Sequence, residues 1–281
     1  MFVVTGATGN VGRSLVRAMA EAGERVTAVS RGTAPVNLPK GTGHVRADLS
    51  APETLRPAFD GAEALFLHDG GTGGVGLDPR AILDVARAAG IPRVVLLSSQ
   101  GVVTRPESES HGGVMRAVEE AVRESGLAWT ILRPGVFASN AYAWAESVRA
   151  ERTVAAPFGD VGIPVIDPAD IAEVAAAALR KDEHAGRAYV LNGPAAVTPR
   201  QQAEAIGAAL GEPVRFVELT RAEARARMAP FMPEASVETS LAVLGEPSAA
   251  ELRLSPDVEH VLGRAPRPFA EWARRNAEAF R

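Results

Sequence analysis

The sequence predicts an α/β fold: a Rossmann-like, doubly wound parallel sheet with a smaller, mostly helical C-terminal lobe. Three observations support this prediction. Short β-rich segments alternate with helical patterns through the first half of the chain, a glycine-rich segment follows the first strand, and the alternation loosens after residue 135. Strands that alternate with helices are typical of parallel pairing through right-handed crossovers.

Six strands are predicted before that point, at Phe2–Thr5, Arg25–Val29, His44–Ala47, Ala64–Leu67, Val94–Leu97 and Trp129–Leu132. The spacing of apolar residues predicts the helices between them, at Val11–Ala22, Leu55–Phe59, Asp78–Ala89 and Gly113–Glu124. Later patterns predict one more strand at Ala188–Leu191 and helices at Asn140–Ala150, Ala169–Leu179 and about 200–210, 220–228, 234–244 and 255–280.

The composition excludes several classes of protein. A chain of 281 residues can bury a sizeable core, and the absence of cysteine excludes disulfides, thiolate nucleophiles and iron–sulfur clusters. The 30 basic and 34 acidic residues give a net charge of −4 without basic runs, which disfavours nucleic-acid and membrane partners. The five histidines lack metal-ligand spacing, so we expect no metal site. Without a signal peptide or a membrane span, the expected location is the cytoplasm.

The strongest motif is a phosphate-binding loop between the first strand and the first helix. Gly6 permits the tight turn, Gly9 lets the backbone approach a pyrophosphate, and Gly12 lets helix and strand pack closely. The helix that opens there offers unpaired N–H groups to an anion. We therefore predict dinucleotide binding by this loop, including Thr8, Asn10 and Val11.

The cofactor is expected to be NADP(H) in preference to NAD(H). The second strand ends in Ser30 and Arg31 with no carboxylate for a ribose hydroxyl, and Arg31 can pair with a 2′-phosphate. The alternative is that Arg31 is a solvated loop residue. The G-x-x-G-x-x-G spacing resembles the short-chain dehydrogenase/reductase superfamily, in its extended and atypical branches.

That resemblance places Asp48 and Leu49 against the adenine, and Ser50 is expected to cap the next helix and so leave Asp48 free. We also expect Leu67, His68 and Ser98 at strand ends to contact the cofactor, and residues 70–76 to run beside it or to act as a flap.

Later motifs make the resemblance more specific. They are Ser98-Ser99-Gln100-Gly101, the helix from His111 to Glu120, the segment from Ser125 to Gly135, Asn140, Gly159-Asp160, Asp167-x-x-Asp170-Ile171-Ala172 and Gly186-x-Ala-Tyr189. Together they resemble the NmrA-like atypical short-chain reductases over nearly the whole chain. The resemblance implies an NAD(P) domain and a substrate-covering lobe. Some relatives reduce quinones, triphenylmethane dyes or phenolic double bonds, and others bind NADP as regulators.

The usual catalytic pair of the superfamily is absent. Its Tyr-x-x-x-Lys positions are occupied here by His111 and Met115, and neither Tyr142 nor Tyr189 is followed by lysine at the fourth position. His111 could replace the tyrosine as proton donor, since imidazole titrates near neutral pH. Alternatively, no protein acid is needed, because a conjugated acceptor delocalises the added charge. His111 could also be a surface or capping residue.

The resemblance places Pro134, Gly135, Val136 and Phe137 beside the nicotinamide. The expected substrate pocket comprises His68, Gln100, Phe137, Asn140, Tyr142, Trp144, Met228 and Phe231, the last two as part of a lid. The aromatic residues could equally be core, and Met228 and Phe231 could be packing within the lobe.

The predicted function is that of an NADPH-dependent reductase, which transfers hydride to a conjugated, largely apolar small molecule such as a quinone or enone. The alternatives are a non-catalytic NADP(H)-binding regulator or redox sensor, and a cofactor-dependent isomerase or cyclase. We expect the NADP domain at 1–135, with about 153–192 returning to the sheet, and the lobe at about 136–152 and 193–281. A monomer or a homodimer is expected.

Overall fold

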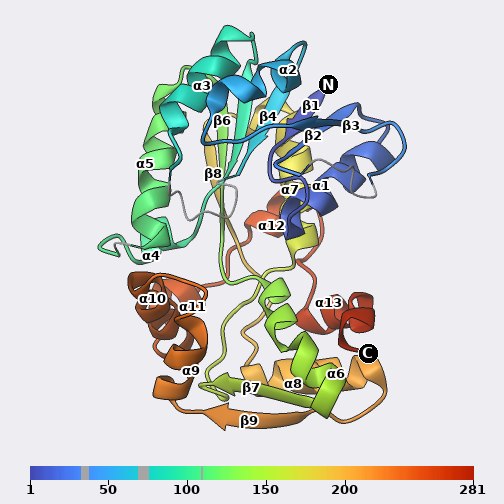
Figure 1. Ribbon diagram of the computed structural model, residues 1–281, viewed down its shortest axis with the longest axis vertical. Helices are drawn as coiled ribbons and strands as arrows, with labels where there is room; N and C mark the ends of the chain where they lie inside the picture. Colours follow the sequence, from blue (N-terminus) through green and yellow to red (C-terminus); the bar gives the residue numbers. More distant parts are fainter. Residues whose placement is uncertain (33–37, 69–75, 109) are drawn as a thin grey trace.

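The computed structural model describes residues 1–32, 38–68, 76–108 and 110–281, and it does not describe the side chain of His111. A seven-stranded sheet in the order β3-β2-β1-β4-β5-β6-β8 forms one half of the molecule (Figure 1). Every neighbouring pair in it is parallel. Its strands are β1 (Phe2–Val4), β2 (Val26–Ser30), β3 (Gly43–Arg46), β4 (Ala64–Leu67), β5 (Arg93–Leu97), β6 (Ala128–Pro134) and β8 (Arg187–Leu191). The predicted fold class is confirmed.

Helices cover both faces of this sheet, and each face has its own apolar core. One face packs against α1 (Asn10–Glu21), α7 (Pro168–Arg180) and α12 (Asp257–Leu262). The other packs against η1 (Pro52–Leu55), α2 (Arg56–Phe59), α3 (Pro79–Ala88) and α5 (His111–Glu124). The direction of winding reverses between β1 and β4, and in such sheets ligands bind beyond the carboxyl ends of the strands near that reversal.

The second half of the molecule is a lobe below that edge (Figure 1). Its elements are η2 (Ala138–Trp144), α6 (Ala145–Glu151), β7 (Thr153–Pro157), α8 (Pro199–Leu210), β9 (Arg215–Leu219), α9 (Arg221–Met228), α10 (Glu234–Gly245), α11 (Ala249–Leu252), α13 (Phe269–Arg275) and η4 (Ala277–Phe280). Two short elements, α4 (Gly101–Thr104) and η3 (Asp182–His184), belong to the sheet half. Among the described residues, no helix is long and apolar enough to cross a membrane.

Two expectations for the lobe need correction. Residues 153–157 do not return to the main sheet, because β7 pairs in parallel with β9 in a separate two-stranded sheet. Val154 on β7 is wholly buried in the lobe core, which explains why the strand stays there. The predicted helix at 255–280 is also divided, because Gly263 ends α12 in a left-handed conformation and Pro268 caps α13.

Candidate functional site

The glycine loop after β1 forms a cradle that a side chain would fill. Gly6 has φ +60°, a left-handed conformation that favours glycine. A Cβ atom on Gly12 would lie 2.2 Å from the Gly6 carbonyl oxygen, and one on Gly9 would lie 3.3 Å from it. Gly9 is the N-cap of α1 without a side-chain cap, so the first N–H groups of α1 remain available to an anion. This geometry fits a pyrophosphate.

Side chains hold the loop from both sides. Thr5 Oγ1 donates to the Phe66 carbonyl and accepts from His68 N, which joins the ends of β1 and β4. The His68 side chain lies over Gly6, where a Cβ atom would be 2.9 Å from His68 Nδ1. Asn10 Nδ2 donates to Ser139 Oγ, so the lobe contacts the loop directly.

The predicted loop residues differ in what they can offer a cofactor. Thr8 is exposed beside the cradle, whereas Val11 and Leu67 are buried in the two sheet cores. The side chains of Val11 and Leu67 therefore hold strands and helix in place and cannot reach a ligand. The predicted flap at 70–76 lies outside the described residues except for Gly76.

Two arginines lie at the neighbouring carboxyl ends of β2 and β3. Arg31 is exposed, and Arg46 Nε donates to the Arg31 carbonyl from the neighbouring β3. Arg46 was not singled out in the sequence, although it ends the strand next to Arg31. The pair gives this corner of the edge a positive charge where a 2′-phosphate is expected.

Asp48 is not free, contrary to expectation. Its Oδ1 accepts from Ser50 N at 2.9 Å and from Ser50 Oγ at 2.8 Å, and these bonds lower the pKa of the carboxyl group. Ser50 does not cap the next helix, because the N-cap of η1 is Ala51 and no side chain caps it. Leu49 is partly buried against the core below. An adenine contact of Asp48 or Leu49 stays a prediction.

Ser98 does not face the site but belongs to a buried ion network. Its hydroxyl donates to the Glu119 carboxylate at 2.6 Å, and Arg133 donates to the same carboxylate at 2.6 and 2.9 Å. Arg123 adds a bond of 3.0 Å. Burial of Glu119 favours its neutral form, but the bonds from Arg133 and Ser98 outweigh burial and lower its pKa. The network fixes the ends of β5 and β6 relative to α5.

Glu119 was not predicted as a functional residue, although the sequence of α5 carries a signal for it. Glu119 interrupts the apolar face of α5, where Met115, Val118 and Val122 are all buried. A carboxylate on such a face needs a cationic partner. Met115 itself is in the core, so the position of the usual lysine carries no charge and faces no ligand.

A cavity of about 250 Å³ lies at the carboxyl ends of β5 and β6. Several predicted residues gather on its wall, namely Gln100, Pro134, Gly135, Val136 and Asn140. The segment from α4 to α5 and the lobe complete the wall with Ser99, Gly101, Thr104, Arg105, Ser108, Ser110, Gly112, Ile163, Pro164, Ser236, Thr239, Ser240, Val243, Leu244 and Glu251. The cavity therefore lies between the sheet edge and helices α10 and α11.

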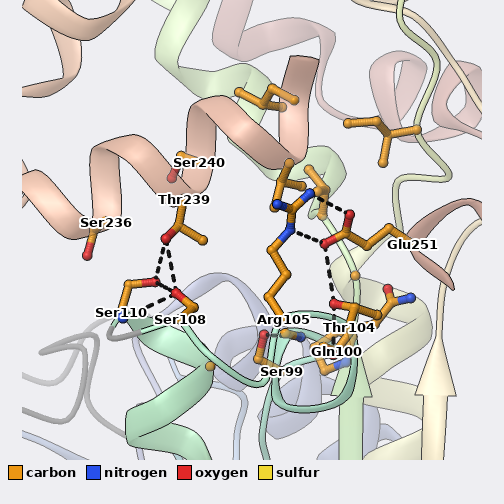
Figure 2. A pocket seen from close by; sticks show the side chains of 18 of the residues that line it. Ser99, Gln100, Thr104, Arg105, Ser108, Ser110, Ser236, Thr239, Ser240 and Glu251 are labelled. Atoms are coloured by element: carbon orange, nitrogen blue, oxygen red, sulfur yellow. Dashed lines mark hydrogen bonds and ion pairs between the residues drawn. The ribbon is translucent and has the colours of Figure 1, made fainter. Parts of the chain in front are cut away.

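An ion pair crosses from α4 to α11 beside the cavity (Figure 2). Arg105, at the C-terminal end of α4, donates from Nε and Nη2 to the two Glu251 oxygens at 2.8 and 2.9 Å. Thr104 Oγ1 adds a bond of 3.3 Å to the same carboxylate, and Gln100 Nε2 donates to the Ala250 carbonyl. Burial of Glu251 raises its pKa, but the bonds from Arg105 and Ser248 together outweigh burial, so the pKa is lowered.

Three hydroxyls meet on another part of the wall (Figure 2). Ser108 Oγ lies 2.7 Å from Ser110 Oγ and 3.0 Å from Thr239 Oγ1, and Ser110 Oγ lies 3.1 Å from Thr239 Oγ1. Thr239 comes from α10, whereas the serines precede α5. We call these three groups the hydroxyl ring.

The other expected pocket residues do not line this cavity. Tyr142 donates to Asn276 Oδ1 at 2.6 Å, and its ring packs against Trp272 and Phe280 at centroid distances of 5.1 and 6.1 Å. Trp144 packs against the same lobe core. The rings of Tyr142, which stays 37% exposed, and of Trp144 thus lie beside C-terminal aromatic residues, and nothing in the sequence near residue 140 indicated that they would be neighbours.

Phe137 packs against the sheet core, and Met228 packs against the small core of α9 and α10. Phe231 is 85% exposed between those helices. His111 is the first residue of α5, and its side chain lies outside the described part of the structure. The catalytic role of His111 stays a prediction. Among the described residues, no group of acidic and histidine side chains could hold a metal ion.

A family model described as NAD(P)H-binding matches residues 6–182. The chain belongs to this NAD(P)H-binding family. It is 36% identical over 290 residues to "(4-alkanoyl-5-oxo-2,5-dihydrofuran-3-yl)methyl phosphate reductase" of Streptomyces griseus, with 100% of this chain and 99% of that protein covered. It is 33% identical over 286 residues to the NAD(P)H azoreductase of Xenophilus azovorans, with the same coverage. The predicted oxidoreductase class is confirmed.

Solved structures show the same fold. The triphenylmethane reductase of Citrobacter sp. in complex with NADP(H) has a TM-score of 0.79 at 21% identity, covering 99% of this chain and 100% of its own. The NADPH-dependent quinone oxidoreductase of Escherichia coli has a TM-score of 0.78 at 23% identity, covering 98% and 99%. The negative transcriptional regulator NmrA has a TM-score of 0.71 at 20% identity, covering 97% and 94%. The predicted NmrA-like resemblance is confirmed.

Proposed function

We propose that this chain is an NADPH-dependent reductase of a small, conjugated carbonyl compound. The observation that supports this most is the cavity between the carboxyl ends of β5 and β6 and the lobe, on the same sheet edge as the glycine cradle. The two relatives matched over their full length are both named as reductases, one of them of an alkanoyl-oxo-dihydrofuran phosphate. That compound carries a double bond conjugated to carbonyl groups, as an enone does.

The lining of the cavity differs from the predicted pocket, although most of its exposed surface is apolar. Its described lining contains no aromatic side chain. Hydroxyl groups are frequent instead, from Ser99, Thr104, Ser108, Ser110, Ser236, Thr239 and Ser240. An apolar part of the wall, from Val136, Ile163, Val243 and Leu244, leaves room for an alkyl or ring portion. We therefore propose a small amphipathic substrate in place of a large flat dye.

The residues present fit a nicotinamide dinucleotide. The cradle of Gly6, Gly9 and Gly12 would hold the pyrophosphate, and Arg31 with Arg46 beside it would hold a 2′-phosphate, which favours NADPH. When bound, the cofactor supplies a hydride to the substrate. The resemblance places Pro134, Gly135 and Val136 beside the nicotinamide, and these three residues line the cavity.

Ser99 is the side chain best placed to assist the reaction. Its Oγ accepts from Gly101 N at 3.1 Å, and its proton has no protein acceptor among the described residues. We propose that Ser99 donates this proton in a hydrogen bond to the substrate carbonyl, where negative charge develops during reduction. In a conjugated acceptor this charge is spread, so a tyrosine–lysine pair is not required.

The proposal is tested by following NADPH oxidation with a small cyclic enone, a quinone, a triarylmethane dye and an azo dye. We expect the enone to be reduced fastest, and a mass measurement to show a product with two added hydrogens. We expect Ser99→Ala to lower kcat about 100-fold while the NADPH Kd stays unchanged. Tight NADPH binding without reduction of any enone or quinone would contradict the proposal.

A further inference from the structure

The hydroxyl ring is unusual in where its bonds go. Ser110 is the N-cap of α5, yet its hydroxyl makes no capping bond and turns to Ser108 and Thr239. Serine at this position normally accepts from an N–H of the first helical turn. Ser110 is only 6% exposed, and the residue lines the cavity. The buried Ser110 hydroxyl therefore lies on the cavity wall and does not cap the helix, although its position in the sequence would allow it to.

The ring can direct several protons to one acceptor. Each hydroxyl carries one proton and can rotate it without moving its oxygen. In the described contacts these protons are shared only within the ring. A ligand oxygen that replaced these mutual contacts could accept bonds from more than one hydroxyl. A group with several lone pairs, such as a phosphate or carboxylate, uses such donors best.

The surrounding charges permit an anion. Among the described lining residues, the charged side chains are Arg105 and Glu251, and they bond to each other through two hydrogen bonds. The single carboxylate is thus neutralised. Ser108 N donates to the Arg105 carbonyl at 3.1 Å, so Arg105 and Ser108 belong to the same turn of the chain.

We propose that the hydroxyl ring binds an oxyanion group of the substrate, a phosphate or a carboxylate, and so selects anionic substrates. This rests on the proposed function, because it names the class of compound that the same cavity reduces. Ser99 and the ring line one cavity, on separate parts of its wall (Figure 2), and one substrate would contact both. Ser108, Ser110 and Thr239 are then specificity-determining residues. The competing explanation is that the ring only joins α10 to the turn before α5.

The experiment compares three matched enones that end in a phosphate monoester, a carboxylate or an alcohol. Rates are measured with NADPH, and binding is measured by calorimetry with the NADP⁺-loaded enzyme, which cannot reduce the enone. We expect the phosphate or the carboxylate to be preferred over the alcohol by about tenfold to hundredfold, the effect of one charge-assisted hydrogen bond. The stronger of the two identifies the oxyanion.

Ser108→Ala and Thr239→Val should each remove most of this preference and leave kcat/KM for the alcohol within about threefold. Ser236→Ala is the matched control, since it removes a hydroxyl from the same cavity outside the ring, and the preference should stay within about twofold. An equal loss on all three enones, or no preference in the wild type, would overturn the proposal. If no enone is reduced but the ring variants still weaken binding of the anionic enone, the reductase proposal fails and the ring proposal stands.

Discussion

The cofactor edge and the substrate cavity are built on different principles. At the cofactor edge, one continuous segment, from Thr5 to Gly12, leaves its backbone groups open to a ligand. In the cavity, side chains from α4 and the turn before α5 meet side chains from α10 and α11, although more than 100 residues separate the first pair of segments from the second. This local site tolerates little variation, because Gly6 has a left-handed conformation and Gly12 has no room for a Cβ atom. A site assembled from distant segments can change substrate by exchanging single side chains.

The largest effect should come from filling the cradle. Gly12→Ala places a methyl group 2.2 Å from the Gly6 carbonyl oxygen, and backbone must move to relieve the clash. We expect NADPH to bind about 100-fold more weakly. Gly43→Ala on β3 is the control, since its new Cβ atom meets nothing closer than 3.8 Å. Calorimetry measures both, and circular dichroism checks folding. Undiminished binding in Gly12→Ala would show that the loop does not hold the pyrophosphate as described.

The Glu119 network supports the substrate cavity, because it fixes the ends of β5 and β6, next to Ser99 and Pro134. Glu119→Gln leaves the Arg133 guanidinium, on a side chain that is 16% exposed, beside a buried neutral amide. We expect a loss of about 3 kcal/mol in the free energy of unfolding, measured with urea. Glu120→Gln, exposed and next in sequence, should change it by less than about 0.5 kcal/mol.

The stabilisation by Glu119 should also depend on pH in a predictable direction. The pKa of Glu119 is lower in the folded chain than its ordinary value, so its charge stabilises the fold above about pH 4.3. This stabilisation is lost as the pH falls through the folded-state pKa. The advantage of the wild type over Glu119→Gln should therefore shrink on acidification. A difference that stays constant from pH 7 to about pH 3 would show that the charge of Glu119 is not what stabilises the strand ends.

A smaller effect is expected from replacing Arg31, and it should differ between NADPH and NADH binding. Arg31→Ala should weaken NADPH binding about tenfold, the loss of one charge-assisted bond, and leave NADH binding unchanged. Arg25→Ala is the matched control, because Arg25 lies just before the opposite end of the same strand. Equal losses for both cofactors would mean that Arg31 contacts something other than the 2′-phosphate.

The same comparison explains what could be predicted from the sequence. The sheet, its helices and the glycine loop follow local patterns, so each predicted strand of the sheet is found with its ends shifted by at most two residues. Strands β7 and β9 were missed because they form a pair within the lobe, and only that pairing distinguishes them from loops. Gln100 and Asn140 were placed in the pocket from their positions after β5 and β6. Thr239 and Glu251 could not be placed there, since no local pattern reports the folding of α10 and α11 onto the sheet edge.

The smallest expected effect is that of replacing Phe231, and it tests whether this part of the lobe closes over the substrate. The sequence suggested a lid of Met228 and Phe231, but the structure leaves Phe231 85% exposed and packs Met228 against the α9–α10 core. If Phe231 is only a surface residue, Phe231→Ala changes the free energy of unfolding by less than about 0.5 kcal/mol and leaves KM unchanged. Met228→Ala is the comparison, since it should cost stability without affecting KM. A raised KM in Phe231→Ala alone would show that this segment closes over the substrate, and the cavity wall would then extend beyond α10 and α11.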